Sequence, residues 1–130
     1  MKNALSIIAL SALLSCANDD AFNLTTSADL NGKWIEARTK GDTLTFESWD
    51  SMEIMTLDRG KEMRGGYLLP EYGSGPYQYK LSNGKISLYW MLSSNYAFKD
   101  FKFKQTGNML TIANFYNSSS GSTLTFVRLN

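Results

Sequence analysis

Short runs in which hydrophobic and polar side chains alternate dominate the chain from Gly32 onward. In Phe101-Lys102-Phe103-Lys104 and Leu124-Thr125-Phe126 every second side chain is hydrophobic, the period of a strand with one buried face. The phenylalanines and Leu124 should therefore point inward. No segment carries the 3.6-residue apolar period of a long helix. The pattern predicts strands at residues 33–39, 43–48, 52–57, 67–69, 77–81, 85–92, 101–106 and 109–115, with 123–129 as a ninth candidate that makes 67–69 the doubtful one.

Turn residues separate several of these runs by only two or three positions. Asn83-Gly84 is the strongest hairpin signal, because both central residues of its turn need positive φ, and Gly107-Asn108 and Lys40-Gly41-Asp42 separate further pairs. Strands joined in this way are antiparallel neighbours. A long meander has two exposed edges unless it closes on itself. We therefore predict an all-β fold, an antiparallel up-and-down β-barrel of about eight strands.

The segment at residues 85–92 is apolar on both faces of its predicted strand. Ile86, Leu88 and Trp90 alternate with Tyr89 and Met91. One face fills the core, so the other must meet a second group. Three candidates are a folded-back loop at residues 93–100, a partner protein and a ligand.

Residues 59–76 form a long, glycine-rich stretch in an otherwise tightly connected meander. Long loops in compact domains are often functional. Two interpretations fit: a surface hairpin with a short edge strand, or a lid at the mouth of the barrel.

The N-terminus has the pattern of a secretory signal. Lys2 precedes a small-and-apolar run of 11 residues that ends at Leu14, too short for a membrane span of about 20 residues. Leu13-Leu14-Ser15-Cys16 resembles the bacterial lipobox, which implies cleavage before Cys16 and a lipid on its thiol. Two or more acyl chains anchor a protein stably to a membrane. We expect a lipoprotein signal peptide at residues 1–15, a polar tether at 16–27 and a barrel domain at 28–130, with Ser27 capping one helical turn at 28–31.

Gly32-Lys33-Trp34 opens the first predicted strand, and Arg128 lies near the end of the last. Arg128 shares a strand face with Phe126, so its guanidinium can reach an indole beneath the core, a contact worth about 0.5–2 kcal/mol. With these motifs the chain resembles lipocalin-type barrels, in particular the small lipocalin-like lipoproteins of Bacteroidetes-type bacteria. The resemblance covers about residues 29–130 and implies that Gly32, Trp34 and Arg128 close the barrel.

The same resemblance implies a location. The protein would be anchored in the outer membrane through the lipid on Cys16, facing the periplasm or the cell surface. Asp19-Asp20, shortly after the cysteine, resembles the signal that sends some of these lipoproteins to the surface.

The residue inventory argues against catalysis. The chain has no histidine, and Cys16 is its one cysteine, so the commonest general base and metal ligand are missing, and no thiol remains once Cys16 carries lipid. No Asp-x-Asp-x-Asp calcium loop is present. Without Lys2, twelve basic residues balance twelve acidic ones, which disfavours a nucleic-acid partner. We expect no enzymatic activity, no cofactor, no metal site and no nucleic-acid partner.

Aromatic side chains are the remaining candidates for a functional site. The chain has seven Tyr, seven Phe and three Trp; small barrels fill their interior with most such rings, and those at a rim or mouth are free to bind. We predict a small apolar or amphipathic ligand in or at the mouth of the barrel. The alternative is a filled barrel that serves as a protein-interaction module of the cell envelope. An interior cavity of about 300 Å³ or more, lined by the aromatic residues, favours the ligand, and a packed interior favours the protein-interaction module. The residues expected to bind it are Trp49, Tyr67, Tyr77, Tyr79, Tyr89, Trp90 and Tyr96.

Overall fold

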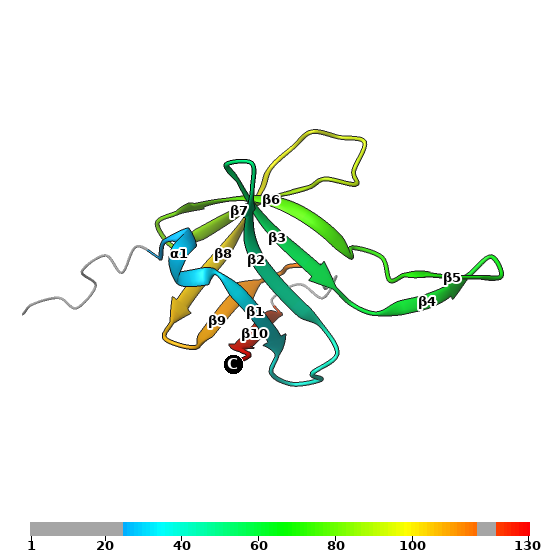
Figure 1. Cartoon of the computed structure of the whole chain (residues 1–130), viewed down its shortest axis with the longest axis horizontal. Coiled ribbons are helices and arrows are strands. Elements are labelled where there is room, and N and C mark those ends of the chain that lie inside the picture. The colour runs from blue at the N-terminus through cyan, green and yellow to red at the C-terminus, as the bar shows by residue number, and fades with distance from the viewer. Residues whose placement is uncertain (1–24, 117–121) are drawn as a thin grey trace, which may run out of the picture.

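The computed structural model describes residues 25–116 and 122–130, which form a closed antiparallel barrel (Figure 1). Its strands follow the order β1-β10-β9-β8-β7-β6-β3-β2, so the first strand pairs with the last. The predicted all-β, eight-stranded barrel is confirmed. The elements are α1 (Ser27–Leu30), β1 (Gly32–Glu36), β2 (Thr43–Trp49), β3 (Met52–Asp58), β4 (Lys61–Arg64), β5 (Tyr67–Pro70), β6 (Gly75–Ser82), β7 (Lys85–Trp90), β8 (Lys99–Thr106), β9 (Met109–Ala113) and β10 (Thr123–Arg128).

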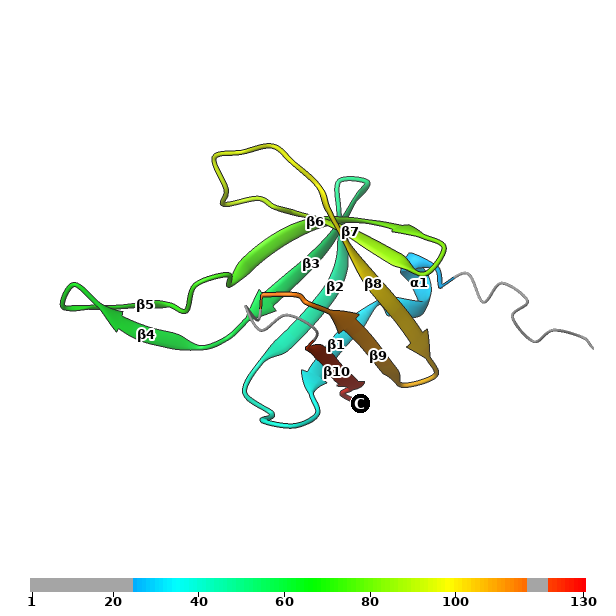
Figure 2. The same ribbon diagram turned by 180° about the vertical axis from the view of Figure 1, so that it is seen from behind.

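Strands β4 and β5 form a separate hairpin that projects away from the barrel in both views (Figures 1 and 2). Of the two interpretations of residues 59–76, the surface hairpin is the one observed. The doubtful strand at 67–69 exists as β5, outside the barrel. The sequence does not predict β4, because Lys61-Glu62-Met63-Arg64 lacks the β-branched and aromatic residues typical of strands. Gly65-Gly66 is the hairpin signal that marks it.

The inward-facing side chains of the barrel strands fill its interior. The bulkiest of the fully buried ones are Trp34, Phe46 and Phe126. As the alternation predicts, Phe103 and Phe126 are buried in this core, and Phe101 and Leu124 pack against it. The prediction of which side chains of β8 and β10 face inward, made from the alternation of hydrophobic and polar residues, is therefore confirmed.

The two ends of the barrel differ in their connections. The strand register places the tight β2–β3, β6–β7 and β8–β9 turns at the end that carries α1, which we call the α1 end. The β1–β2, β7–β8 and β9–β10 loops and the β4–β5 hairpin leave from the opposite end, the open end. The α1 helix and the hairpin accordingly lie on opposite sides of the barrel (Figures 1 and 2).

The α1 helix begins one residue before its expected start, and Thr26 rather than Ser27 is the N-cap. The Thr26 hydroxyl accepts a hydrogen bond from the Asp29 backbone N–H at 3.3 Å, and the Asp29 carboxylate accepts one from the Thr26 backbone N–H at 2.8 Å. This reciprocal capping box needs an acceptor three residues after the cap. Three residues after Ser27 lies Leu30, which has none, so the prediction for Ser27 was wrong.

The outer face of β7 is covered by the loop that follows it. The Tyr89 ring lies 4.7 Å from the Tyr96 ring and 5.8 Å from the Phe98 ring, centroid to centroid. The Lys80 ammonium sits 4.4 Å from the centroid of Phe98. Of the three predicted candidates for this face, the folded-back loop is therefore the one in contact with it.

Candidate functional site

A pocket of about 330 Å³ lies at the open end of the barrel. The β4–β5 hairpin base, the β7–β8 loop and the start of the β9–β10 loop surround it, while barrel strands form its floor. It is a pocket at the mouth and not an interior cavity, because side chains fill the barrel interior, which is the outcome that favours the protein-interaction alternative. Its volume lies near the lower end of the range of about 300–1,000 Å³ for small-molecule sites. The residues that line it are Tyr72, Gly73, Tyr77, Leu88, Trp90, Ser93, Asn95, Ala97, Lys99, Phe101, Phe115 and Tyr116.

Stacked and edge-on aromatic rings form the wall of this pocket. Tyr77 and Trp90 are cross-strand partners on β6 and β7, and their rings stack at 6.3 Å between centroids. Phe115 meets Tyr77 edge to face at 5.4 Å, and Tyr72 meets Trp90 in the same way at 5.4 Å. Such arrangements are the preferred geometries of aromatic pairs. The wall is thus a packed set of rings.

Hydrogen bonds fix the two central rings. The Tyr77 hydroxyl donates to the Gly73 carbonyl at 2.6 Å, and Trp90 Nε1 donates to the Ser74 carbonyl at 3.2 Å. Burial raises the pKa of Tyr77 to about 12, so this phenol stays neutral and remains a donor through neutral pH. The polar atoms of both rings are therefore bound within the protein, and the surface that the rings give to the pocket is apolar.

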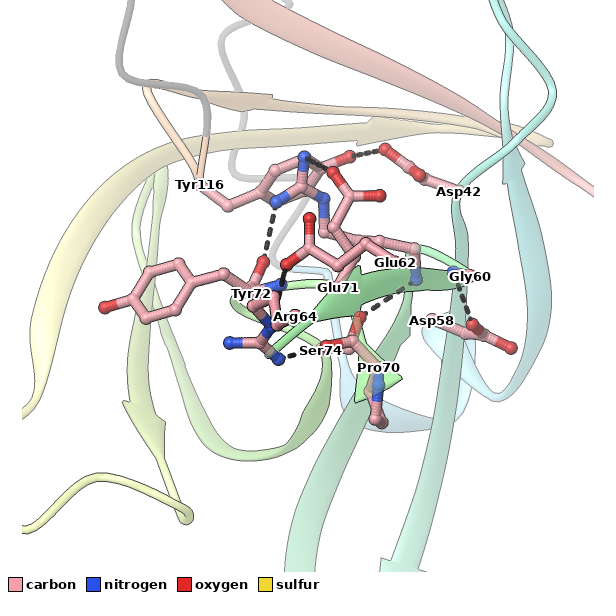
Figure 3. Close-up of polar contacts among 11 residues, drawn as sticks. Asp42, Asp58, Gly60, Glu62, Arg64, Pro70, Glu71, Tyr72, Ser74 and Tyr116 are labelled. Atoms are coloured by element: carbon pink, nitrogen blue, oxygen red, sulfur yellow. Dashed lines mark hydrogen bonds and ion pairs between the residues drawn. The ribbon is translucent and has the colours of Figure 1, made fainter. Parts of the chain in front are cut away.

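A cluster of polar contacts includes two residues of the pocket lining, Tyr72 and Tyr116 (Figure 3). Arg59 Nη1 donates to the Tyr72 carbonyl at 2.6 Å, and Arg59 Nη2 lies 2.9 Å from a Glu71 carboxylate oxygen. The guanidinium carbon of Arg59 also lies 4.5 Å from the centroid of the Tyr116 ring. The Tyr116 hydroxyl donates to the Asp42 carboxylate at 2.6 Å. These contacts join the hairpin base to the β1–β2 and β9–β10 loops and hold the rim in shape.

Burial, and secondly the bond to Asp42, raises the pKa of Tyr116. Lys99, Asn95 and Ser93 supply the remaining polar side chains of the pocket lining. Lys99 forms no ion pair within the described residues. An apolar floor with a few polar groups at the edge is the usual composition of a small-molecule site.

The opposite end of the barrel is sealed. The Arg128 guanidinium carbon lies 4.2 Å from the centroid of the Trp34 ring, and its nitrogens donate to the backbone carbonyls of Asn31, at 2.6 Å, and Asp29. Trp34 Nε1 donates to the Leu30 carbonyl at 2.8 Å. Trp34 and Arg128, the pair that the sequence resemblance implied, therefore both hold the α1 turn through hydrogen bonds.

Gly32 belongs to the same arrangement. Its φ is 118°, a backbone conformation that residues other than glycine rarely adopt, and a Cβ at this position would lie 3.4 Å from Arg128 Nη1. The position therefore requires glycine both for its backbone angle and for the close guanidinium.

The structure brings two of the seven predicted ligand-binding residues together, Tyr77 and Trp90. Tyr79 is buried in the core, where its hydroxyl donates to Glu53 at 3.2 Å, and burial raises its pKa. Tyr89 and Tyr96 pack on the outer face of the barrel. Tyr67 lies on the projecting hairpin and Trp49 at the α1 end, both exposed.

The sequence did not predict three of the aromatic lining residues as ligand-binding: Phe101, Phe115 and Tyr116. A fourth, Tyr72, belongs to the stretch at 59–76 for which a lid at the barrel mouth was one of the two interpretations. Phe115 and Tyr116 follow β9 after Asn114, because the strand predicted at 109–115 ends earlier than expected, at Ala113. A run of two aromatic residues before the serine-rich stretch at 117–122 was the available signal. Residues 117–121 lie outside the described part of the chain.

Two other depressions have less claim to binding. One of about 380 Å³ is lined by Lys85, Asp100, Phe101, Lys102, Ala113 and Asn114, and one of about 250 Å³ lies over β8–β10. Both are more open to solvent than the pocket at the open end and have fewer aromatic rings in their walls. The aromatic pocket is therefore the candidate site.

Comparisons with known proteins add no relative: no family model, no curated protein and no solved structure matches this chain. Within residues 25–116 and 122–130, no helix is long and apolar enough to span a bilayer. In the same residues, no three acidic, histidine or cysteine side chains gather where a metal ion could be held. The predicted signal peptide and Cys16 lie outside the described residues.

Proposed function

We propose that this protein is a membrane-anchored, lipocalin-like lipoprotein that binds a small apolar or amphipathic molecule at the mouth of its barrel. The observation that carries the proposal is the asymmetry of the two ends. One end is closed by α1, Trp34 and Arg128, and the other holds an aromatic-lined pocket of about 330 Å³. A ligand therefore enters from the side of the long loops.

The composition of the pocket supports an amphipathic ligand. Trp90, Tyr77 and Phe115 offer apolar ring surface, and burial of apolar ligand area among such rings contributes roughly 25 cal/mol per Å². Lys99 and Asn95 stand where a polar head would meet water. The volume is near the lower end of the usual range of about 300–1,000 Å³, which limits the ligand to a small molecule.

Contact quenching of tryptophan fluorescence tests the location of the ligand. A bromine-substituted dodecanoic acid quenches an indole only when it touches it. We expect quenching that persists in Trp49→Phe and is lost in Trp90→Phe, because Trp49 lies at the α1 end and Trp90 lines the pocket. Equal quenching in the two variants, or none in the parent chain, contradicts the proposal.

Filling the pocket tests affinity. Ala97 lines the pocket and Ala37 is exposed in the β1–β2 loop outside it, so Ala97→Phe and Ala37→Phe add the same ring at two places. We expect at least a tenfold loss of dodecanoate affinity in Ala97→Phe alone, measured by calorimetry on chains that start at residue 17 and melt at similar temperatures. Equal affinities in the two variants would remove the pocket as the binding site.

The anchor is a separate part of the proposal. Its support is the lipobox-like Leu13-Leu14-Ser15-Cys16, and outer-membrane location follows from the resemblance alone. We expect the natural chain in the membrane fraction, labelled by radioactive palmitate, and Cys16→Ser unlabelled. Protease added to intact cells then distinguishes the cell-surface face from the periplasmic one. An unlabelled natural chain contradicts lipid attachment.

A further inference from the structure

The β4–β5 hairpin differs from every other part of the described sheet structure. All eight barrel strands have a neighbour on each side, whereas β4 and β5 pair only with each other among the described strands. Each of the two therefore leaves one edge of backbone N–H and C=O groups without a strand beside it. Open edges of this kind are templates for pairing with a further strand. We call residues 61–70 the arm.

The arm is held firmly where it leaves the barrel. Arg59 contacts Tyr72 and Glu71 across the base, and Glu62 accepts a hydrogen bond from the Tyr72 backbone N–H at 3.4 Å (Figure 3). The Glu71 backbone N–H donates to the Gly60 carbonyl at 2.9 Å. The base thus fixes the direction of the arm, which carries its edges away from the barrel (Figures 1 and 2).

Large apolar side chains on the arm are exposed. Met63 and Leu68 are cross-strand partners on one face, 65% and 60% exposed, and Tyr67 on the other face is 73% exposed. A two-stranded hairpin without further cover is at best marginally stable in water. The arm therefore presents apolar surface that a further pair of strands would shield.

The turn decides which backbone groups face outward. Gly65 and Gly66 both have positive φ, 58° and 83°, as in a two-residue type I′ turn, so Arg64 and Tyr67 form the hydrogen-bonded pair that flanks it. Hydrogen-bonded and non-hydrogen-bonded pairs alternate along an antiparallel ladder. The next pair, Met63 with Leu68, therefore directs its backbone groups away from the hairpin. Met63 offers both a donor and an acceptor on the free edge of β4.

The free edge of β5 is the poorer one. It includes Pro70, which has no N–H, and the Pro70 carbonyl already accepts a hydrogen bond from Arg64 Nη2 at 2.6 Å. The free edge of β4 is therefore the better one for pairing with a further strand.

We propose that two copies of this chain pair through their β4 strands, antiparallel, with Met63 of one copy opposite Met63 of the other on a two-fold axis. In this register Glu62 of each copy lies opposite Arg64 of the other, so the charges complement each other twice. The apolar face becomes a continuous row of Leu68, Met63, Met63 and Leu68 across four strands. A two-fold axis needs such a self-complementary edge.

The neighbouring registers are unfavourable. Those that keep the hydrogen-bond alternation and the two-fold axis centre on Glu62 or on Arg64, and they place Glu62 opposite Glu62 or Arg64 opposite Arg64. Like charges directly opposite each other destabilise a strand pair. The sequence Lys61-Glu62-Met63-Arg64 thus selects the register centred on Met63.

Disulfide trapping in the full-length protein tests the pairing. Met63→Cys places two thiols at opposing positions whose Cα atoms are about 5.5 Å apart in a hydrogen-bonded pair, within the span of a disulfide. Leu68→Cys is the matched control, since it is similarly exposed but lies three strand spacings, about 14 Å, from its equivalent. We expect a linked dimer on a non-reducing gel with Met63→Cys, and no more linked dimer with Leu68→Cys than with the parent chain.

Charge exchange tests the register. Glu62→Lys or Arg64→Glu, each added to Met63→Cys, should lower the linked fraction at least fivefold, because each creates two repulsive pairs. Co-expression of these two chains should restore it, because every opposing pair is again of opposite charge. Equal linking of the two cysteine variants, no linking through Met63→Cys, or no recovery in the mixed pair overturns the proposal.

Discussion

Arg128 holds the α1 turn on the sealed end of the barrel, and Arg128→Met removes its charge while keeping an unbranched apolar stem. The guanidinium donates to the carbonyls of Asp29 and Asn31 and covers the Trp34 ring at 4.2 Å. Methionine can still lie over the indole, but it donates no hydrogen bond. The substitution therefore isolates the polar part of the closure.

The expected cost follows from these contacts. Hydrogen bonds from a charged donor contribute about 1.5–3 kcal/mol each. Because Arg128 is partly exposed, we take about 1 kcal/mol for each of its two hydrogen bonds. The cation–π contact adds about 0.5–1 kcal/mol. Arg128→Met should thus lower the free energy of unfolding by about 2–3 kcal/mol, a large share of the roughly 5–15 kcal/mol of a typical domain.

Urea denaturation measures this difference directly. Lys104→Met is the control, because Lys104 is an exposed strand residue for which the same change should cost less than about 0.5 kcal/mol. Trp34→Phe combined with Arg128→Met completes a double-mutant cycle that reports the coupling of the two side chains. A loss below about 0.5 kcal/mol in Arg128→Met, or zero coupling, would show that the pair does not close the barrel.

Three further predictions concern other positions. Gly32→Ala should cost about 1–3 kcal/mol because of its φ of 118°, whereas Gly41→Ala, without positive φ, should cost little; equal shifts in urea melts contradict this. The pKa of Glu36 is lowered because hydrogen bonds from Thr39 and Arg38 outweigh its burial. The ionised carboxylate therefore stabilises the folded protein above pH 4.5, and this contribution is lost as the pH falls below that value. Glu36→Gln should therefore flatten the fall in melting temperature between about pH 6 and 3, and parallel curves count against the assignment. Burial raises the pKa of Tyr77 to about 12, so the contribution of the neutral phenol to the free energy of unfolding is lost as the pH rises above 10. Tyr77→Phe should remove one late-ionising tyrosine from an ultraviolet titration, and an unchanged late phase would contradict this assignment.

The barrel was predictable from the sequence because its signals are local. Alternation in β8 and β10 and the Asn83-Gly84 turn each act within a few residues. Only one strand of the arm was predicted, at residues 67–69. The other, β4, forms because it pairs with β5 across the glycine turn, and its own side chains are not typical of strands.

The pocket was less predictable, because loops far apart in the sequence supply it. Tyr77 and Trp90 lie on predicted strands, and their inward direction follows from the alternation. Tyr72 and Tyr116 are placed by contacts with Arg59, a long-range arrangement that no local pattern contains. Phe115 and Tyr116, which were not predicted as ligand-binding, therefore lie in a loop, whereas Phe101 lies on β8.

The pairing of β1 with β10 also determines when this protein is able to fold. A growing chain that has not yet added Arg128 lacks the strand that joins the two ends of the sheet, and its Trp34 has no guanidinium above it. Contacts between residues nearly a hundred positions apart carry a high loop-closure entropy and make folding slow. The native barrel thus becomes accessible only after β10 has been synthesised, and until then β1 and β9 lack the strand that joins them.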